Sequence, residues 1–151
     1  MHAELRPAAN TEAEQIRALM AAVIRTSVTD DETVRADTIA NVNRNVEFWL
    51  DHPEKCVHIV ATVSGTIVGV ILVKEFWNLC SLFVEPKHQG NGLGRALVNA
   101  AVAACRGKSP KQAVWLNAAT NAIGFYTHLG FEPRQSRQQL PPGFMPMQLL
   151  L

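Results

Sequence analysis

A glycine-rich loop between a strand and a helix constrains this chain more than any other stretch. The apolar run from Leu79 to Val84 has the length of a buried strand, and apolar residues recur at helical spacing from Leu93 to Cys105. Between them stand three glycines within five residues, Gly90, Gly92 and Gly94. Glycine adopts backbone conformations closed to other residues and lets a ligand approach the main chain. The pattern predicts a ligand-binding loop at the start of a helix.

The loop suits an anion, because the first amides of a helix lack intrahelical partners and carry the positive end of the helix dipole. Two common phosphate motifs do not fit. The third glycine in Gly90-Asn91-Gly92-Leu93-Gly94 comes one residue too early for the dinucleotide fingerprint G-x-G-x-x-G. The glycine-lysine-serine or glycine-lysine-threonine sequence of a P-loop does not occur. The sequence therefore argues against a nicotinamide or ATP site.

The loop does match the pattern Gln/Arg-x-x-Gly-x-Gly/Ala, in the residues Gln89 to Gly94. Leu82 to Pro86 precede it, and Asn121 to Tyr126 and Leu129 to Phe131 follow downstream. With these flanks in this order, the chain resembles the GCN5-related N-acetyltransferase (GNAT) family. The resemblance implies an α/β (α+β) fold, with a mixed, mostly antiparallel sheet of about seven strands and helices on both faces. It also implies a splay between the fourth and fifth strands and a single domain over residues 1–151.

Composition limits the remaining classes. A chain of 151 residues with 48% hydrophobic and 18% charged residues is one ordinary folded domain. Its formal charge of +1 gives no electrostatic footprint for a nucleic-acid partner. No apolar run reaches the roughly 20 residues that span a bilayer and the N-terminus lacks a signal-peptide pattern, so we expect a cytoplasmic protein without a membrane partner. Cys56, Cys80 and Cys105 fit no disulfide or zinc pattern, so we expect buried thiols and no metal.

Periodicity and turn signals place the other elements. We expect a strand ending near Pro7, a helix over Ile16 to Ile24 capped by Asn10 or Thr11, a helix from Val34 to Leu50, a hairpin from Cys56 to Lys74, strands from Trp77 to Val84 and from Ala113 to Asn117, a short helix ending near His128, and two final strands from Phe131 and from Phe144.

The resemblance assigns acetyl-CoA as the acetyl donor. Its diphosphate would lie on the glycine loop, and its pantetheine arm would pair with the preceding strand. A backbone N–H near Phe83 or Val84 could then polarise the thioester carbonyl. The implied cofactor-binding residues are Leu82, Phe83, Val84, Gln89, Gly90, Asn91, Gly92, Leu93, Gly94, Arg95, Asn117 and Asn121.

Tyr126, the only tyrosine, occupies by resemblance the position whose phenol faces the CoA sulfur as general acid. A phenol with a pKa of about 10 stays protonated at neutral pH and can give its proton to the departing thiolate. The alternative is a packing aromatic like Phe125, because adjacent rings on a helix usually point one inward and one outward.

The general base is not defined by the pattern. Many family members carry a carboxylate on the strand before the loop, where this chain has Asn78, and an amide cannot act as a base. Glu75, Glu47 and His58 are the candidates, although a histidine in an alternating strand is more often simply exposed.

Three aromatic residues are candidate substrate contacts. Phe48 and Trp49 belong to a region that lies over the acceptor side of the cleft in the resembling family, and Trp77 begins the strand before the loop. The alternative is that these rings belong to the core, because large aromatics at helical spacing usually pack inside.

These features predict an acetyl-CoA-dependent N-acetyltransferase that moves an acetyl group directly, in a ternary complex, to a primary amine of a small molecule or peptide. The alternative is a non-catalytic CoA- or acyl-CoA-binding sensor or interaction module on the same fold, which the missing carboxylate favours. The lack of an obvious acidic cluster favours an acceptor that is not strongly cationic. The resemblance also implies a homodimer, and its local support is the apolar C-terminal strand, Met145 to Leu151, which we expect to be exposed.

Overall fold

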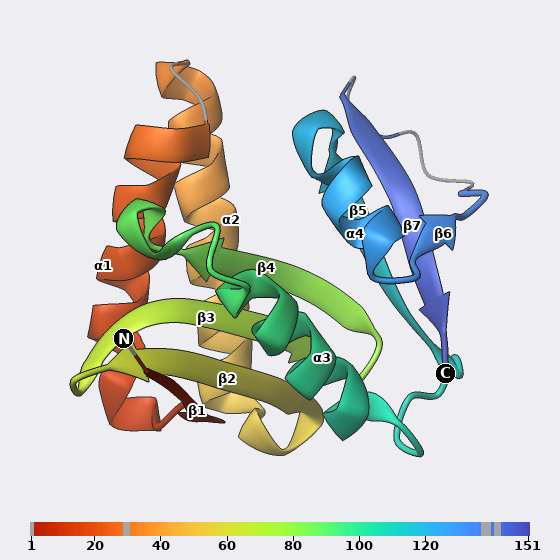
Figure 1. Cartoon of the computed structure of the whole chain (residues 1–151), viewed down its shortest axis with the longest axis horizontal. Coiled ribbons are helices and arrows are strands. Elements are labelled where there is room, and N and C mark those ends of the chain that lie inside the picture. The colour runs from red at the N-terminus through yellow and green to blue at the C-terminus, as the bar shows by residue number, and fades with distance from the viewer. Residues whose placement is uncertain (1, 29–30, 137–139, 141–142) are drawn as a thin grey trace.

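Seven strands of one mixed sheet form the centre of the molecule (Figure 1). They are β1 (Ala3–Pro7), β2 (Cys56–Val63), β3 (Thr66–Lys74), β4 (Asn78–Val84), β5 (Ala113–Ala119), β6 (Glu132–Pro133) and β7 (Phe144–Leu150), in the spatial order β1-β2-β3-β4-β5-β7-β6. The computed structural model describes residues 2–28, 31–136, 140 and 143–151. All neighbouring strands are antiparallel except β4 and β5, which are parallel.

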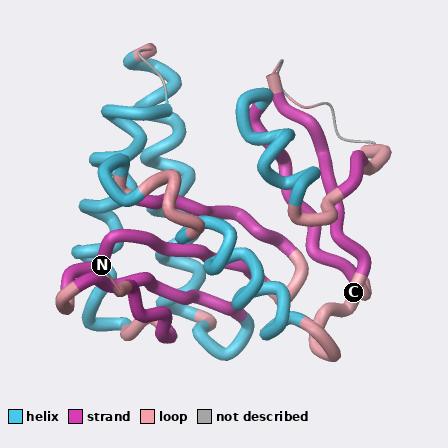
Figure 2. Tube along the Cα trace, in the orientation of Figure 1, coloured by secondary structure: helices cyan, strands magenta, loops and turns pink. Residues whose placement is uncertain are grey.

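Helices cover the sheet on both faces (Figure 2). They are α1 (Ala13–Val23), α2 (Glu32–Asp51), α3 (Leu93–Cys105) and α4 (Ile123–His128), and shorter helical turns occur at Asn10–Glu12, Ile24–Val28, Pro53–Lys55, Pro86–His88 and Thr120–Ala122. The Asp31 carboxylate caps α2 by accepting from the amides of Thr33 and Val34. Within the described residues, no helix is long and apolar enough to cross a membrane.

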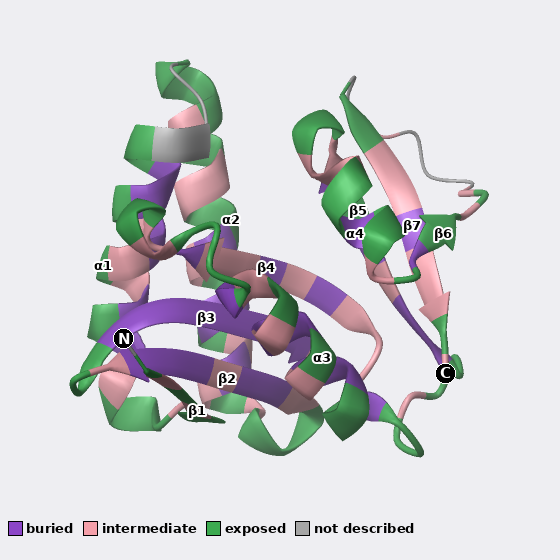
Figure 3. Ribbon diagram, viewed as in Figure 1, coloured by how far each residue is buried: buried purple, intermediate pink, exposed green. Residues whose placement is uncertain are grey.

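Two apolar clusters lie on opposite faces of the sheet. Residues of α3 and α4 pack with side chains from β2, β3, β4, β5 and β7 on one face. Residues of α1 and α2 pack with side chains from β2, β3 and β4 on the other. The central strand β3 is buried along most of its length for this reason (Figure 3). The mixed sheet with helices on both faces confirms the expected fold class.

The sheet opens between β4 and β5. The register joins these two strands at a single pair, Asn78 with Trp115, and the Trp115 amide also donates to the Trp77 carbonyl at 2.7 Å. Beyond that point the strands are not paired toward Val84 and Ala119. The expected splay between the fourth and fifth strands is therefore present.

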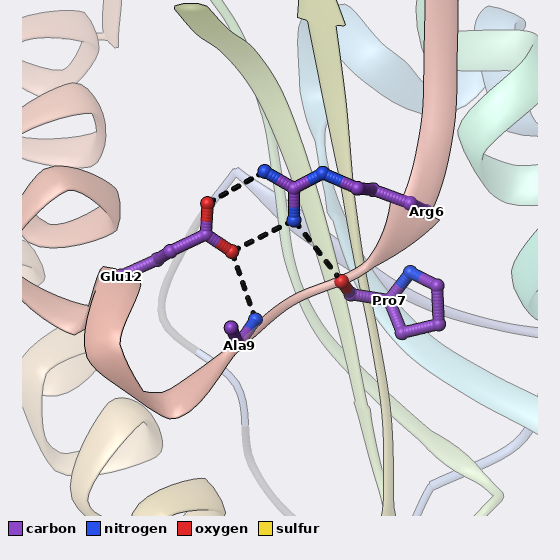
Figure 4. Close-up of polar contacts among 4 residues, drawn as sticks. All are labelled: Arg6, Pro7, Ala9 and Glu12. Carbon is purple, nitrogen blue, oxygen red and sulfur yellow. Dashed lines mark hydrogen bonds and ion pairs between the residues drawn. The ribbon is translucent and has the colours of Figure 1, made fainter. Parts of the chain in front are cut away.

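The start of α1 differs from the expectation that Asn10 or Thr11 would cap it. The Glu12 carboxylate accepts from the Ala9 amide at 2.8 Å and from both terminal nitrogens of Arg6 at 2.8 and 2.6 Å (Figure 4). The turn begins after Ala9, which has no capping side chain, so the acid inside the first turn satisfies the free amide. This contact ties β1 to α1.

The C-terminal strand also differs from its expected exposure. β7 lies between β5 and β6, and Met147 is fully buried against the α4 side. Strand alternation leaves Phe144 and Leu150 on the opposite face, where they are exposed.

Candidate active site

The glycine loop ends at the N-terminus of α3. Gly90 and Gly92 have φ angles of +81° and +79°, and a Cβ built on either residue would meet no atom within 4 Å. The first helical amide to find a partner is that of Ala96, which donates to the Gly92 carbonyl at 3.0 Å. The amides just before it are free of intrahelical acceptors, so they can hold an anion in the open space over the loop.

The backbone of β4 presents unpaired groups toward the splay. The Glu85 amide donates to the carbonyl of Val68, the residue that lies opposite it in the register of β3 and β4. Because hydrogen-bonded pairs alternate along an antiparallel ladder, Phe83 faces β3, whereas the N–H and C=O groups of Leu82 and Val84 face β5. The Gln89 side chain donates to the Val84 carbonyl at 2.9 Å, which is consistent with this assignment. The sequence expectation of a donor near Phe83 or Val84 stays a prediction, and this alternation favours the Val84 N–H.

Tyr126 lies on α4, inside the apolar cluster that α3 and α4 form with one face of the sheet. Its ring contacts Phe125 and Phe131 edge-on, with centroid distances of 5.0 and 5.5 Å, and its side chain is 8% exposed. Burial raises the pKa of the phenol to about 12. The group is therefore a hydrogen-bond donor at neutral pH. Packing and proton donation are compatible here.

A pocket of about 500 Å³ lies on the α2 side of the splay. Asn78 and Cys80 of β4, Asn117 of β5 and Asp37 of α2 contribute to its lining, together with Lys74. The resemblance assigns Asn117 to the cofactor, which stays a prediction; in the structure Asn117 lines this pocket and also the pocket beside Trp115. Asp37 was missed because it belongs to no motif and reaches the pocket only through the packing of α2.

The three candidate bases lie elsewhere. The Glu47 carboxylate forms an ion pair with Arg17 between α2 and α1, and Glu75 is exposed in the turn after β3 with a φ of +56°. His58 is 6% exposed beneath Trp49, and burial lowers its pKa to about 4. The expectation of an exposed His58 was wrong, because α2 covers this face of β2. None of the three lines the α2-side pocket.

The aromatic candidates separate into two environments. Trp49 is buried in the α1–α2 cluster, which favours the packing interpretation, and Phe48 is half-buried with Lys74 Nζ 5.3 Å from its ring centroid. Trp77 instead lies edge-on to Trp115 at 5.4 Å, beside Asn78. Of the three, only Trp77 lies at the point where β4 and β5 are joined, because its carbonyl accepts from the Trp115 amide.

The thiols are held in their neutral form. Desolvation raises the pKa of Cys80 to about 12 and the pKa of Cys56 and Cys105 to about 11. Cys105 is buried, whereas Cys56 and Cys80 are half-buried. Since the thiolate is the nucleophilic form, Cys80 does not offer an attacking group in the pocket at neutral pH.

Comparison with known proteins gives a family and a set of folds. Residues 44–151 match the family model described as an acetyltransferase (GNAT) domain. An uncharacterized N-acetyltransferase of Methanocaldococcus jannaschii is 30% identical over 100 residues, which are 58% of this chain and 44% of that protein. The chain thus spans less than half the length of this curated relative.

Several solved structures share the fold. The PaiA N-acetyltransferase of Thermoplasma acidophilum, in complex with coenzyme A, has a TM-score of 0.81 at 14% identity over 100% of both chains. A GCN5-related N-acetyltransferase of Rhodopseudomonas palustris has a TM-score of 0.77 at 22% identity over 100% of this chain and 97% of that chain. YncA of Salmonella typhimurium, with its cofactor acetyl-CoA, has a TM-score of 0.70 at 17% identity, over 99% and 94%.

Proposed function

This chain belongs to the acetyltransferase (GNAT) domain family, and from that premise we propose that it transfers an acetyl group from acetyl-CoA to a primary amine. The observation that carries the proposal is the unpaired edge of β4 beside the glycine loop. An inner strand that is paired along one edge only, adjacent to free helix amides, can hold an extended ligand that ends in a diphosphate.

The glycine loop is assigned to the diphosphate. The open space over Gly90 and Gly92 and the free amides of Leu93, Gly94 and Arg95 support this assignment, since successive N–H groups at a helix start attract an anion. Gln89 and Asn91 belong to the loop, and the Gln89 bond to Val84 fixes the loop against β4.

The pantetheine arm is assigned to the edge formed by Leu82 and Val84. The Leu82 N–H and C=O groups and the Val84 N–H would pair with it as with a further strand, whereas the Val84 carbonyl already accepts from Gln89. An N–H from this edge would polarise the thioester carbonyl, as a fixed donor placed where negative charge develops. Asn121, exposed in the turn before α4, remains a proposed contact for the arm.

Proton movements are assigned to Tyr126 and to the α2-side pocket. In the transfer the N–C bond forms, the C–S bond breaks, one proton leaves the amine nitrogen and one joins the sulfur. Tyr126 gives the proton to the sulfur, and Asp37, the one carboxylate that lines this pocket among the described residues, takes the amine proton directly or through water. The neutral state of Cys80 supports direct transfer over an acetylated thiol.

A matched pair of glycine variants tests the donor site. Gly92→Val is expected to lower acetyl-CoA affinity more than tenfold by calorimetry, because its side chain would fill the space over the loop. Gly65→Val is the control, since Gly65 has a φ of +81° and equal free space in the turn between β2 and β3. Equal affinities in the two variants would contradict the assignment. Binding without CoA release across a panel of amines would support a sensor instead.

A further inference from the structure

Two tryptophans and two cations form a cluster on the face of β5 that α4 does not cover. Trp77 and Trp115 are edge-to-face, and Lys111 Nζ lies 4.5 and 4.3 Å from their ring centroids. The Arg134 guanidinium carbon lies 3.9 Å from the Trp115 centroid. Cations over tryptophan faces are attracted by the ring quadrupole, so the contacts favour both charges on this face.

The described residues supply no carboxylate partner to these two cations. No ion pair within the described residues includes Lys111 or Arg134. Arg134 is half-buried, and its Nη1 donates to the Gln135 carbonyl at 3.2 Å. Its Nε is buried and has no hydrogen-bond partner among the residues that the structure describes. A partly desolvated guanidinium with unused donors is unfavourable unless an anion completes it. The cluster therefore has the chemistry of an anion subsite.

The subsite is continuous with the α2-side pocket. Trp77, Trp115 and Arg134 line a pocket of about 490 Å³, and this pocket shares Asn78 and Asn117 with the one that contains Asp37. A molecule at the junction of the two pockets would reach a carboxylate in one direction and two cations in the other. Both pockets are in the size range of small-molecule sites.

We propose that the acceptor is a primary amine that carries a carboxylate, with the amine at the junction of Asn78 and Asn117 and the carboxylate at Arg134 and Lys111. The inference rests on the proposed acetyl transfer and names its substrate class. A planar guanidinium fork matches the two oxygens of a carboxylate, and Lys111 adds a second positive charge. The carboxylate is unchanged by the transfer.

Matched acids and amines test the proposal. L-phenylalanine and phenethylamine, and 6-aminohexanoate and pentylamine, differ only by a carboxylate. For the unaltered protein, at least one acid is expected to have a kcat/KM about tenfold or more above that of its partner. Arg134→Gln is expected to raise KM for that acid about tenfold with kcat nearly unchanged, and to leave the partner amine unaffected. Lys111→Gln should act in the same direction.

Lys108→Gln is the matched control, because Lys108 stacks on Phe76 at 5.4 Å, whereas Lys111 stacks on the two tryptophans of the cluster. Intrinsic fluorescence gives a readout independent of turnover, since two of the three tryptophans line the subsite. A saturable change with the acids, lost in Arg134→Gln, supports the proposal. No saturable change with any acid overturns it.

Failure of this inference is distinguishable from failure of the proposed function. If calorimetry shows no acetyl-CoA binding by the unaltered protein, the transferase proposal falls and the inference falls with it. If acetyl-CoA binds and the amines are acetylated as well as the acids, the substrate class is wrong and the transferase proposal stands. A preference for phosphoethanolamine over every carboxylate would also overturn the inference.

Discussion

The two halves of the sheet, which meet at β4 and β5, are covered differently. The half formed by β1 to β4 packs against α3 on one face and against α1 and α2 on the other. The half formed by β5, β7 and β6 contributes core residues on the α4 side only, and no residue of the α1–α2 cluster comes from it. Phe144 and Leu150 on its second face are 49% and 63% exposed.

This difference in coverage separates the part of the sheet that holds the donor loop in place from the part that is open to an acceptor. Covering both faces fixes β4 and the loop after it, which are the parts assigned to the donor. The uncovered face of β5 leaves Trp115 and Asn117 open to a second molecule, beside Arg134. The half formed by β5, β7 and β6, which is covered on one face (the one-sided half), also carries Tyr126, so the chemistry and the choice of acceptor are assigned mainly to it. The half formed by β1 to β4, which is covered on both faces (the two-sided half), is assigned to binding of the donor.

The largest expected effect concerns chemistry in the one-sided half. Tyr126→Phe removes only the phenol oxygen, so turnover measured by CoA release should fall about a hundredfold or more, as expected for loss of a general acid. Acetyl-CoA affinity should stay within about twofold of the unaltered protein, because the assigned donor contacts are backbone groups. Unchanged turnover would leave Tyr126 as a packing residue.

The difference in coverage should also appear in the stability of two leucine-to-alanine variants, one in each half of the sheet. Leu72→Ala removes a side chain that is 1% exposed in the two-sided half, and should lower the unfolding free energy by about 2–5 kcal/mol in urea. Leu150→Ala on the uncovered face should cost less than about 0.5 kcal/mol. A similar loss of unfolding free energy at the two sites would show that Leu150 is buried in solution and that this face is not uncovered.

Acid sensitivity should arise in the two-sided half, where His58 is buried. The unfolded chain takes up a proton near pH 6.5, whereas burial lowers the folded-state pKa of His58 to about 4, with the Glu12 carboxylate opposing the shift weakly. Stability is therefore lost as the pH falls from 6.5 to 4, by about 3 kcal/mol. Urea unfolding across this range should give a flatter profile for His58→Gln. An equally steep profile would assign the loss to other groups.

The smallest effect concerns the contact between β1 and α1. Glu12→Gln should lower the unfolding free energy by about 1 kcal/mol, because the Ala9 amide and Arg6 lose a charged acceptor. The Arg6 guanidinium lowers the pKa of Glu12 to about 2, so the difference between the two proteins should shrink as the pH falls below 4.5. Glu14→Gln, which removes an exposed ion pair with Arg17, is the control and should cost less than about 0.5 kcal/mol.

Local patterns in the sequence were sufficient to predict most of the helices and strands. β2, β3 and α3 have the expected boundaries, because alternation, helical spacing and the glycine loop are properties of neighbouring residues. The cap at Ala9 was missed because a carboxylate three residues later, not the preceding side chain, satisfies the amide. His58 was misjudged because exposure of a strand residue depends on whether a distant helix covers it.

The acceptor side could not be predicted in the same way. Asp37, Lys111 and Arg134 come from three separate segments, and only the packing of α2, the turn before β5 and the turn after β6 brings them around the splay. None of them lies in a motif. The loop assigned to the donor is contiguous in sequence and was therefore recognisable, whereas the pocket assigned to the acceptor is assembled by tertiary structure alone.

The single pair between Asn78 and Trp115 makes β4 an edge strand in the interior of the sheet. Its amides at Leu82 and Val84 should exchange with deuterium as fast as those of a sheet margin, although strands lie on both sides of them. Exchange at these two positions would slow only when a ligand occupies the splay. Deuterium exchange of these two amides, measured by mass spectrometry, would therefore report whether the assigned donor site is occupied, before any acceptor has been found.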